Sequence, residues 1–316
     1  MTRLLRFLSV FSIVLVLGLS QAVAAETPAA APAAAAPAEA ATPAANAAAI
    51  DAIDAITAYD ESKVVGHAKP WEYDFQDAQS PSMVQIEKIH DFIFVIITVI
   101  VIFVMALLAY ICVRFSARAN PNPKRFSHNT LIEIIWTAVP ILILVAIGIP
   151  SLRAHYAYIH NREIIDNPDV TLKVVGHQWY WSYEYPDFGL AYDSNIKKTE
   201  ELKNGEPRLL TVDNPIVVPV NKVVRVQMTS ADVIHAWALP AFGVKQDAVP
   251  GRLNETWFKA AKEGIYYGQC SELCGKFHGF MPIQIHVVSQ EDFDRWVAGA
   301  KLKYAANGTI QFAANQ

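Results

Sequence analysis

Two stretches of the chain are apolar at nearly every position, and both are long enough to be transmembrane helices. The first runs from Phe92 to Val113 without a charged residue, and the second runs from Ile134 to Leu152. At 1.5 Å per residue, the first stretch makes a helix about 33 Å long, enough to span the hydrocarbon core of a bilayer. Pro140 and Pro150 predict a kink within the second helix and a disturbance near its end. The pattern predicts a membrane helical hairpin over residues 81–155.

After this hairpin the pattern changes to short segments in which apolar and polar residues alternate. Residues 170–175, 222–228 and 283–287 show this alternation, which is typical of β-strands. Several short strands separated by Pro, Gly, Asn and Asp predict a sandwich or barrel. A capping box at Ser289–Asp292, followed by apolar residues at helical spacing from Phe293 to Ala300, predicts a final helix. The β domain is expected over residues 156–305, with a tail at 306–316.

The N-terminal part has the pattern of an export signal followed by a low-complexity segment. Residues 1–24 combine two early arginines, an apolar centre and an A-x-A cleavage site, which predicts a signal peptide. An uncleaved anchor is the alternative, although the apolar centre is short for one. Residues 25–49 are mostly Ala and Pro and predict a tether, because repeated prolines interrupt a helix. We assign residues 25–80 to a linker and N-terminal segment outside the membrane.

The charges around the hairpin predict its orientation. The loop between the two helices carries Arg114, Arg118, Lys124 and Arg125 and no acidic residue, whereas residues 51–91 are rich in Asp and Glu. By the positive-inside rule the loop is cytoplasmic, so both flanks and the β domain lie on the other side. The chain of 316 residues is long enough for two domains, and its formal net charge of -4 argues against nucleic-acid binding.

The candidate chemistry is concentrated between residues 270 and 281. Cys270, Cys274, His278 and Met281 have the spacing C-x3-C-x3-H-x2-M, and a second imidazole, His235, lies upstream. Soft sulfur ligands together with imidazole favour copper over hard cations. One copper of the blue-copper type needs a single Cys, so the second thiol indicates two copper ions bridged by thiolates. Because protein atoms can fill every ligand position, this site suits electron transfer better than substrate binding.

Less specific interpretations of these residues remain open. Cys270 and Cys274 can form a disulfide, because the chain is predicted to be exported, or they can bind zinc with a histidine. Zinc leaves Met281 without a role, and either histidine taken alone is more often a loop or core residue. The third cysteine, Cys112, lies in an apolar run and is expected to be a packed or lipid-facing thiol without a function.

Three long strings make the chain resemble subunit II of cytochrome c oxidase, the subunit that carries the dinuclear copper centre CuA. They are GHQWYWSYEY at residues 176–185, DAVPGRLN at 247–254 and YYGQCSELCG at 266–275. The resemblance covers residues from about 70 to about 300. It implies that the β domain is a cupredoxin-like Greek-key barrel, and that the copper loop joins its last two strands.

The resemblance also implies the ligands and the reaction. Copper ligands are expected at His235, Cys270, Cys274, His278 and Met281, together with the backbone carbonyl of Glu272. The Glu272 side chain is then free for Mg²⁺ or Mn²⁺ at the interface with subunit I, although a solvated carboxylate is the simpler interpretation. Electrons are expected to come from cytochrome c and to pass to haem in subunit I, where oxygen is reduced to water and protons are pumped. Expected partners are subunits I and III, cytochrome c and membrane lipid. The expected location is the bacterial inner membrane, with both mature termini and the copper domain periplasmic.

Two further residues take a role from the resemblance. Glu133, at the cytoplasmic start of the second helix, matches a position at the entrance of a proton-uptake path, although a carboxylate there also simply suits the helix dipole. Trp179 matches the point of electron entry, although a cluster such as Trp179, Tyr180 and Trp181 more often belongs to the core of a β domain. The carboxylates expected to dock a basic redox partner are Glu184, Asp193, Asp213 and Asp232.

Three other functions compete with electron entry. Subunit II of a quinol oxidase has the same fold but lacks the copper ligands, all of which are present here. A membrane-tethered copper storage or delivery protein needs an exchangeable site, and a disulfide-bonded periplasmic receptor binds no metal. The chain has no C-x-x-C-H motif, so no covalently attached haem is expected.

Overall fold

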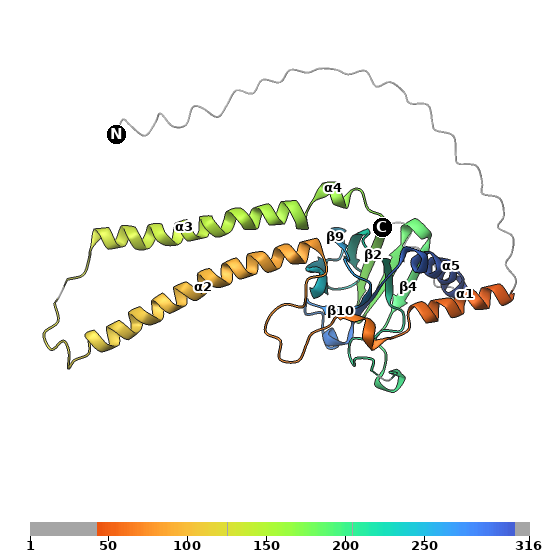
Figure 1. The fold of residues 1–316 in the computed structure, drawn as a ribbon, viewed down its shortest axis with the longest axis horizontal. Coiled ribbons are helices and arrows are strands. Elements are labelled where there is room, and N and C mark those ends of the chain that lie inside the picture. The colour runs from red at the N-terminus through yellow and green to blue at the C-terminus, as the bar shows by residue number, and fades with distance from the viewer. Residues whose placement is uncertain (1–42, 125, 204, 307–316) are drawn as a thin grey trace, which may run out of the picture. The chain divides into compact units, whose positions relative to one another are not determined.

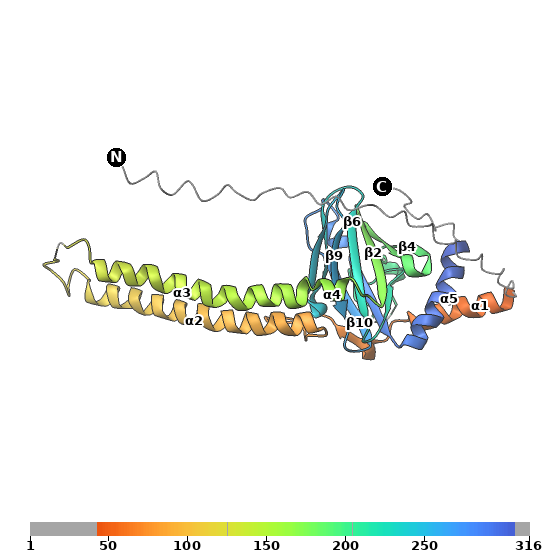
Figure 2. The same cartoon turned by 90° about the horizontal axis from the view of Figure 1, so that it is seen from above.

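The two predicted membrane stretches lie within two long helices that are joined by a short loop (Figures 1 and 2). The computed structural model describes residues 43–124, 126–203 and 205–306. Helix α2 spans Pro81–Arg114 and α3 spans Thr130–Ala154, and both are long and apolar enough to cross a membrane. Their apolar side chains are largely exposed, as expected for surfaces that face lipid or other subunits. The predicted hairpin is therefore confirmed.

Both membrane helices begin at polar caps placed by the sequence. The Ser80 hydroxyl accepts a hydrogen bond from the Met83 amide, and Asn129 does the same for Ile132, which satisfies amides that have no partner within the helix. Helix α3 contains Pro140 and Pro150 and continues into a π-helical turn, η2, at His155–Ile159. A short helix, α4 at Arg162–Ile165, then leads into the β domain.

The β domain consists of two sheets packed around one core. One sheet has the strand order β4-β3-β2-β6-β9, formed by β2 (Val170–His177), β3 (Tyr180–Tyr185), β4 (Leu190–Ser194), β6 (Val223–Ser230) and β9 (Asn254–Lys259). The other has the order β5-β11-β10-β7-β8, formed by β5 (Ile216–Pro219), β7 (His235–Leu239), β8 (Val244–Ala248), β10 (Gly264–Cys270) and β11 (Pro282–Val288), with β1 (Val64–Gly66) added beside β10.

Both sheets contain parallel as well as antiparallel strand pairs. Where strands that follow each other along the chain pair, they do so in antiparallel fashion, and so do β6 with β9 and β7 with β10. Strand β2 pairs in parallel with β6, and β5 with β11. The inward side chains of the two sheets form a continuous apolar core that includes Leu172, Val226, Trp237, Phe258 and Ile285. The three strands predicted from alternation correspond to β2, β6 and β11. The expected cupredoxin-like Greek-key barrel is confirmed.

The helices at the two ends of the described chain pack against each other and against the barrel. Helix α5, Gln290–Ala306, confirms the predicted final helix, and its Phe293 and Trp296 are buried. Helix α1, Pro43–Ile56, begins inside the segment expected to be a tether. A helix is possible there because Pro43 stands at its first position, where no backbone hydrogen bond is lost, and because Ile53 joins the core. The predicted signal peptide at residues 1–24 lies outside the described residues, as do residues 307–316.

Within the part of the chain that the structure describes, five short 3-10 turns connect these elements. They are η1 (Glu61–Lys63), η3 (Pro186–Phe188), η4 (Thr199–Glu201), η5 (Pro240–Phe242) and η6 (His278–Phe280). The last of them, η6, lies in the loop between β10 and β11, and this loop contains most of the candidate metal ligands.

Candidate metal centre

Two neighbouring strands and the loop that follows them bring the candidate ligands together. His235 is the first residue of β7 and Cys270 is the last residue of β10. These strands pair in antiparallel fashion, with Cys270 opposite Trp237, so the imidazole and the thiol lie at the same end of the sheet. The loop from residue 271 to Met281 returns the chain to β11 and carries Cys274 and His278.

The sulfur and nitrogen atoms of the candidate ligands lie within 3.9 Å of their neighbours. The Sγ atoms of Cys270 and Cys274 are 3.9 Å apart. His235 Nδ1 lies 3.9 Å from Cys270 Sγ, and His278 Nδ1 lies 3.6 Å from Cys274 Sγ. Met281 Sδ lies 3.5 Å from Cys274 Sγ. The Glu272 carbonyl oxygen lies 3.4 Å from Cys270 Sγ. Together with the two thiols, the two imidazoles and the thioether, it makes six groups that can bind a metal ion.

This donor set fits a pair of soft metal ions bridged by sulfur. His235, Cys270 and Cys274 are buried, and their ligand atoms all lie within 4.8 Å of one another. Both cysteines are free thiols, and their separation far exceeds the length of an S–S bond. Each thiol has one imidazole beside it, so the set divides evenly between two ions. The sulfur-rich set, with the thioether of Met281, favours copper over zinc.

The two thiols differ in acidity because they have different neighbours. Burial raises the pKa of Cys270, but hydrogen bonds with His235 and with the backbone of Glu272 outweigh it and bring the pKa down to about 7. Burial and the neighbouring Cys270 sulfur raise the pKa of Cys274 to about 12. In the metal-free pair, Cys270 is therefore only about half ionised at neutral pH while Cys274 keeps its proton, and metal binding must release the protons that remain.

His235 is fixed by a carboxylate on its far side. Asp232 Oδ1 lies 2.9 Å from His235 Nε2, so Nδ1 is the nitrogen that faces the thiols. The second carboxylate oxygen of Asp232 accepts a hydrogen bond of 2.7 Å from the Gln178 amide. A carboxylate in this position sets the tautomer and orientation of a ligand imidazole. Asp232, which the sequence predicted as a docking residue, thus lies beside a candidate metal ligand and fixes its ring.

The two predicted tryptophans lie in different places: Trp181 belongs to the core, and Trp179 lies beside the loop of residues 271–281, which we call the metal loop. Trp181 is fully buried and donates through Nε1 to the Met281 carbonyl at 3.1 Å. Trp179 is half-buried, and its Nε1 donates to the Cys274 carbonyl at 3.2 Å. Its ring packs edge-on against Phe277, which is partly exposed. Trp179 therefore connects a ligand residue to the partly exposed edge of the site, while Trp181 holds the loop from inside.

The remaining predicted site residues lie in different surroundings. The Glu272 side chain is exposed beside the metal loop. Glu133 lies in the first turn of α3, where its carboxylate accepts a hydrogen bond of 3.1 Å from the Asn129 amide. This contact completes a reciprocal cap with the Asn129 side chain.

All four carboxylates predicted to dock a partner also make contacts within the domain. Glu184 forms an ion pair with Lys173 at 3.1 Å. Asp193 accepts a 2.6 Å hydrogen bond from Ser182, and Asp213 accepts one of 2.8 Å from the Asn195 amide. Asp213 and Asp232 remain exposed, whereas Glu184 and Asp193 are half-buried.

Sequence reasoning missed two residues that hold the site. Gln178 donates from Nε2 to the Cys274 carbonyl at 2.8 Å, so that this carbonyl has two donors. Gly176 leaves space for His235, because a Cβ atom there would lie 2.8 Å from the imidazole. Neither residue carries chemistry that singles it out in one sequence. Their position beside the conspicuous Trp179 was the available signal.

Comparison with known proteins agrees with this site. The periplasmic domain of cytochrome c oxidase subunit II matches residues 170–288, and the transmembrane domain of the same subunit matches residues 68–154. The match to the periplasmic domain contains the complete candidate metal centre. The two matches together cover more than half of the chain and leave out α1, β1 and α5.

Individual relatives extend over most of the chain. A probable cytochrome c oxidase subunit 2 of Rickettsia bellii is 55% identical over 248 residues, which are 78% of this chain and 90% of the relative. Cytochrome c oxidase subunit 2 of Cereibacter sphaeroides is 45% identical over 286 residues, 84% of this chain and 91% of the relative. The solved periplasmic domain of subunit II from Bradyrhizobium japonicum is 63% identical, covers 44% of this chain and 97% of that chain, and has a TM-score of 0.41. The chain belongs to the cytochrome c oxidase subunit II family.

Proposed function

We propose that this chain is the electron-entry subunit of a cytochrome c oxidase, and that its metal centre holds two copper ions. The observation that carries the proposal is the convergence of His235, Cys270, Cys274, His278, Met281 and the Glu272 carbonyl around one thiol pair. A dinuclear copper centre, when bound there, takes up and releases one electron at a time. The surrounding chain then has to hold the ligands still and connect them to a donor and an acceptor.

The chain supports this role by fixing the ligand loop from both sides. Gln178 and Trp179 hold the Cys274 carbonyl, and Trp181 holds the Met281 carbonyl. Asp232 orients the His235 ring. Because two strands and buried aromatic residues carry these contacts, the loop is pre-organised, and little movement accompanies a change of charge.

We propose that cytochrome c delivers electrons at Trp179 and that haem in subunit I receives them, where oxygen is reduced to water and protons are pumped. Trp179 is the aromatic residue whose indole bonds directly to a ligand residue and also approaches the surface. Glu184, Asp193, Asp213 and Asp232 would attract a basic partner to this side of the domain.

Other parts of the assembly follow from the same proposal. The exposed Glu272 side chain would supply one oxygen ligand to Mg²⁺ or Mn²⁺ at the boundary with subunit I. Glu133, at the loop end of α3, would stand at the entrance of a proton path. The hairpin would lie in a bacterial inner membrane beside subunit I and subunit III, with both mature termini and the metal centre periplasmic.

Replacing each thiol by serine tests the proposal. In the membrane-purified complex, Cys270→Ser and Cys274→Ser should each remove the mixed-valence copper signal from electron paramagnetic resonance spectra. They should also abolish oxidation of reduced cytochrome c, because an alcohol does not replace a bridging thiolate. Cys112→Ser is the matched control, since this thiol lies in α2, outside the metal centre.

Two results would contradict the proposal. One is a wild-type complex that contains the haems but no mixed-valence copper, which would favour a quinol oxidase. The other is a bridging-thiol variant that oxidises cytochrome c at the wild-type rate.

A further inference from the structure

Residues 43–66, which we call the N-terminal strut, lie across the barrel outside the residues matched by the family. Their first part, α1, approaches α5 so closely that a Cβ atom on Gly299 would lie 2.4 Å from the Ala49 carbonyl oxygen. Ile53 is buried in the core, and Asp54 forms an ion pair with Lys303 at 3.3 Å. This close contact between α1 and α5 requires a glycine at position 299, because any side chain there would collide with Ala49.

The second part of the strut occupies an open edge of the strand that ends at Cys270. Strand β1 pairs in parallel with the first half of β10, at Ile265 and Tyr266, while β7 pairs with the end of β10. A Cβ atom on Gly264 would lie 2.6 Å from the Lys63 carbonyl oxygen, so this contact also depends on a glycine. The strut therefore covers backbone groups of the strand that leads into the metal centre.

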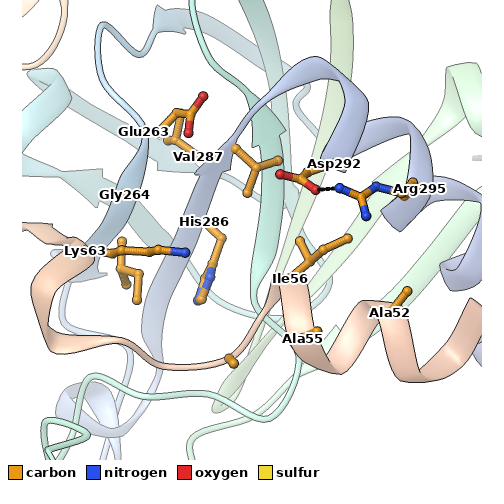
Figure 3. A pocket seen from close by; sticks show the side chains of 13 residues that line it. Ala52, Ala55, Ile56, Lys63, Glu263, Gly264, His286, Val287, Asp292 and Arg295 are labelled. Atoms are coloured by element: carbon orange, nitrogen blue, oxygen red, sulfur yellow. Dashed lines mark hydrogen bonds and ion pairs between the residues drawn. The ribbon is translucent and has the colours of Figure 1, made fainter.

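A buried histidine stands where the strut meets the barrel. His286 of β11 is 3% exposed and lines a cavity of about 380 Å³ between the strut, β10, β11 and α5. Figure 3 shows the His286 side chain beside the end of α1, with the Lys63 side chain extending toward it from the other side. Ala52 and Ile56 line the same cavity from α1. The metal centre does not use this imidazole.

The hydrogen bonds around His286 require the neutral ring. Gln284 Oε1 accepts from the Val212 amide at 3.0 Å, which leaves the Gln284 Nε2 group to face His286 Nε2 at 2.9 Å. An amide NH₂ only donates, so His286 Nε2 must accept and therefore carries no proton. The proton therefore lies on Nδ1, and the Ile56 backbone at the end of α1 acts on the ring in the direction that raises its pKa.

The charges that face His286 also disfavour its protonation. Lys63 of η1 and Lys197, which is paired with Glu206 at 2.8 Å, both act on the ring as like charges. Glu263 lies on the cavity wall before β10, and Asp292 and Arg295 of α5 pair with each other. Burial, together with the two lysines, lowers the pKa of His286 to about 4, and the Ile56 backbone only partly opposes this.

We propose that the N-terminal strut is a pH-sensitive clamp, which stays docked on the copper domain while His286 is neutral and loosens when that ring is protonated. A proton on Nε2 places two donors face to face at Gln284. The docked strut also keeps the charged ring buried and places Lys63 beside it, whereas a loosened strut opens the ring to water, so protonation favours the loosened state. Loosening exposes the edge of β10 that ends at Cys270. The device would respond to acid on the side of the membrane where the barrel lies.

Hydrogen exchange of the full-length chain in detergent measures the docking of the strut. After correction for intrinsic exchange rates, the opening equilibrium of residues 43–66 should increase about tenfold from pH 7.5 to pH 5.5. This follows from a pKa of about 4 when docked and the ordinary value of 6.5 when open. Exchange in β2, which is remote from the strut in the sheet order, should stay unchanged.

Three variants make the test specific. His286→Gln, which stays neutral, should keep the strut protected at pH 5.5, whereas His67→Gln, at an exposed histidine next to the strut, should behave like wild type. Gly299→Ala favours the helix by itself but should release α1 at both pH values through its contact with Ala49. Equal protection of wild type at both pH values overturns the proposal. So does an unchanged pH response in His286→Gln, or full protection in Gly299→Ala.

Discussion

Gly275 occupies a backbone conformation that other residues rarely adopt, at the point where the metal loop passes Trp179. Its φ is +121°, and an added Cβ would lie 3.1 Å from the indole ring. Any residue other than glycine at position 275 would therefore have a strained backbone and would also press against Trp179. Gly279 of the same loop is not among the positive-φ residues, and an added Cβ would meet nothing within 4 Å. The two glycines form a natural pair for comparison.

Gly275→Ala should weaken the metal centre, whereas Gly279→Ala should leave it nearly unchanged. We expect Gly275→Ala to cost about 1–3 kcal/mol, because a non-glycine residue is forced into a strained conformation. The change should displace Trp179 and shift the visible absorption of the copper-loaded complex. Copper content and absorption spectra of both variants check this, and identical spectra for the pair would contradict the expectation.

Trp179 and Trp181 are neighbours in sequence but should differ in function. Trp179→Phe keeps an aromatic ring and removes the donor to the Cys274 carbonyl, so we expect electron entry from cytochrome c to slow by about tenfold, or 1.4 kcal/mol in the barrier. Trp181→Phe should instead lower thermal stability, because it leaves the buried Met281 carbonyl without that donor. Stopped-flow measurement of electron entry from cytochrome c and thermal unfolding distinguish the two variants. Slower electron entry in Trp181→Phe alone would reverse the roles given to the two tryptophans.

At the scale of elements, the joint between α2 and the barrel depends on Ser80. Its hydroxyl donates to the Phe242 carbonyl at 2.6 Å and accepts from the Met83 amide at 3.0 Å, so it both caps the helix and ties it to η5. Gly243 allows this approach, because an added Cβ would lie 3.0 Å from Met83 Cα. The membrane hairpin and the metal domain are thus connected by a buried polar contact as well as by the chain.

Ser80→Ala should destabilise this joint by about 1–2 kcal/mol, the cost of a lost N-cap with a buried acceptor. Ser116→Ala, beyond the other end of α2, removes an exposed hydroxyl and should have little effect. Thermal unfolding of the detergent-solubilised chain, together with proteolysis near residue 80, measures the difference. Equal stability of the two variants would show that the Ser80 contact does not hold the joint.

Local sequence patterns predicted whether a segment is a helix or a strand more reliably than they predicted where the element begins and ends. The apolar stretches and the alternating segments located α2, α3, β2, β6 and β11 because each pattern repeats within a single element. The first turns of α2 lie outside the apolar stretch, and the Ser80 cap that starts them was not used as a signal. Helix α1 was missed because its composition favours a tether, and its stability comes from contacts with α5, far away in the sequence.

At the scale of the whole molecule, surface charge should control the encounter with cytochrome c. Asp213 and Asp232 are exposed, while Glu184 is already paired with Lys173. We expect the association rate of the assembled oxidase with cytochrome c to fall steeply as salt increases, because exposed charges are screened within about 10 Å at 0.1 M salt. Stopped-flow measurements over a range of ionic strength check this. A rate independent of salt would exclude electrostatic docking.

The sequence alone determined the types of the candidate ligands, their spacing, the membrane hairpin and the β-rich class of the domain that follows it. These depend on residue chemistry and on short-range periodicity, which are both visible in a linear chain. The resemblance implied that His235 joins the cysteines and that Trp179 is the entry point. Only the tertiary structure decided how β7 and β10 bring His235 to Cys270, that Asp232 orients the His235 ring, that Trp181 is buried, and that residues 43–66 pack on the barrel. Each of these depends on pairing between distant segments, such as β7 with β10 and α1 with α5, and no local pattern encodes it.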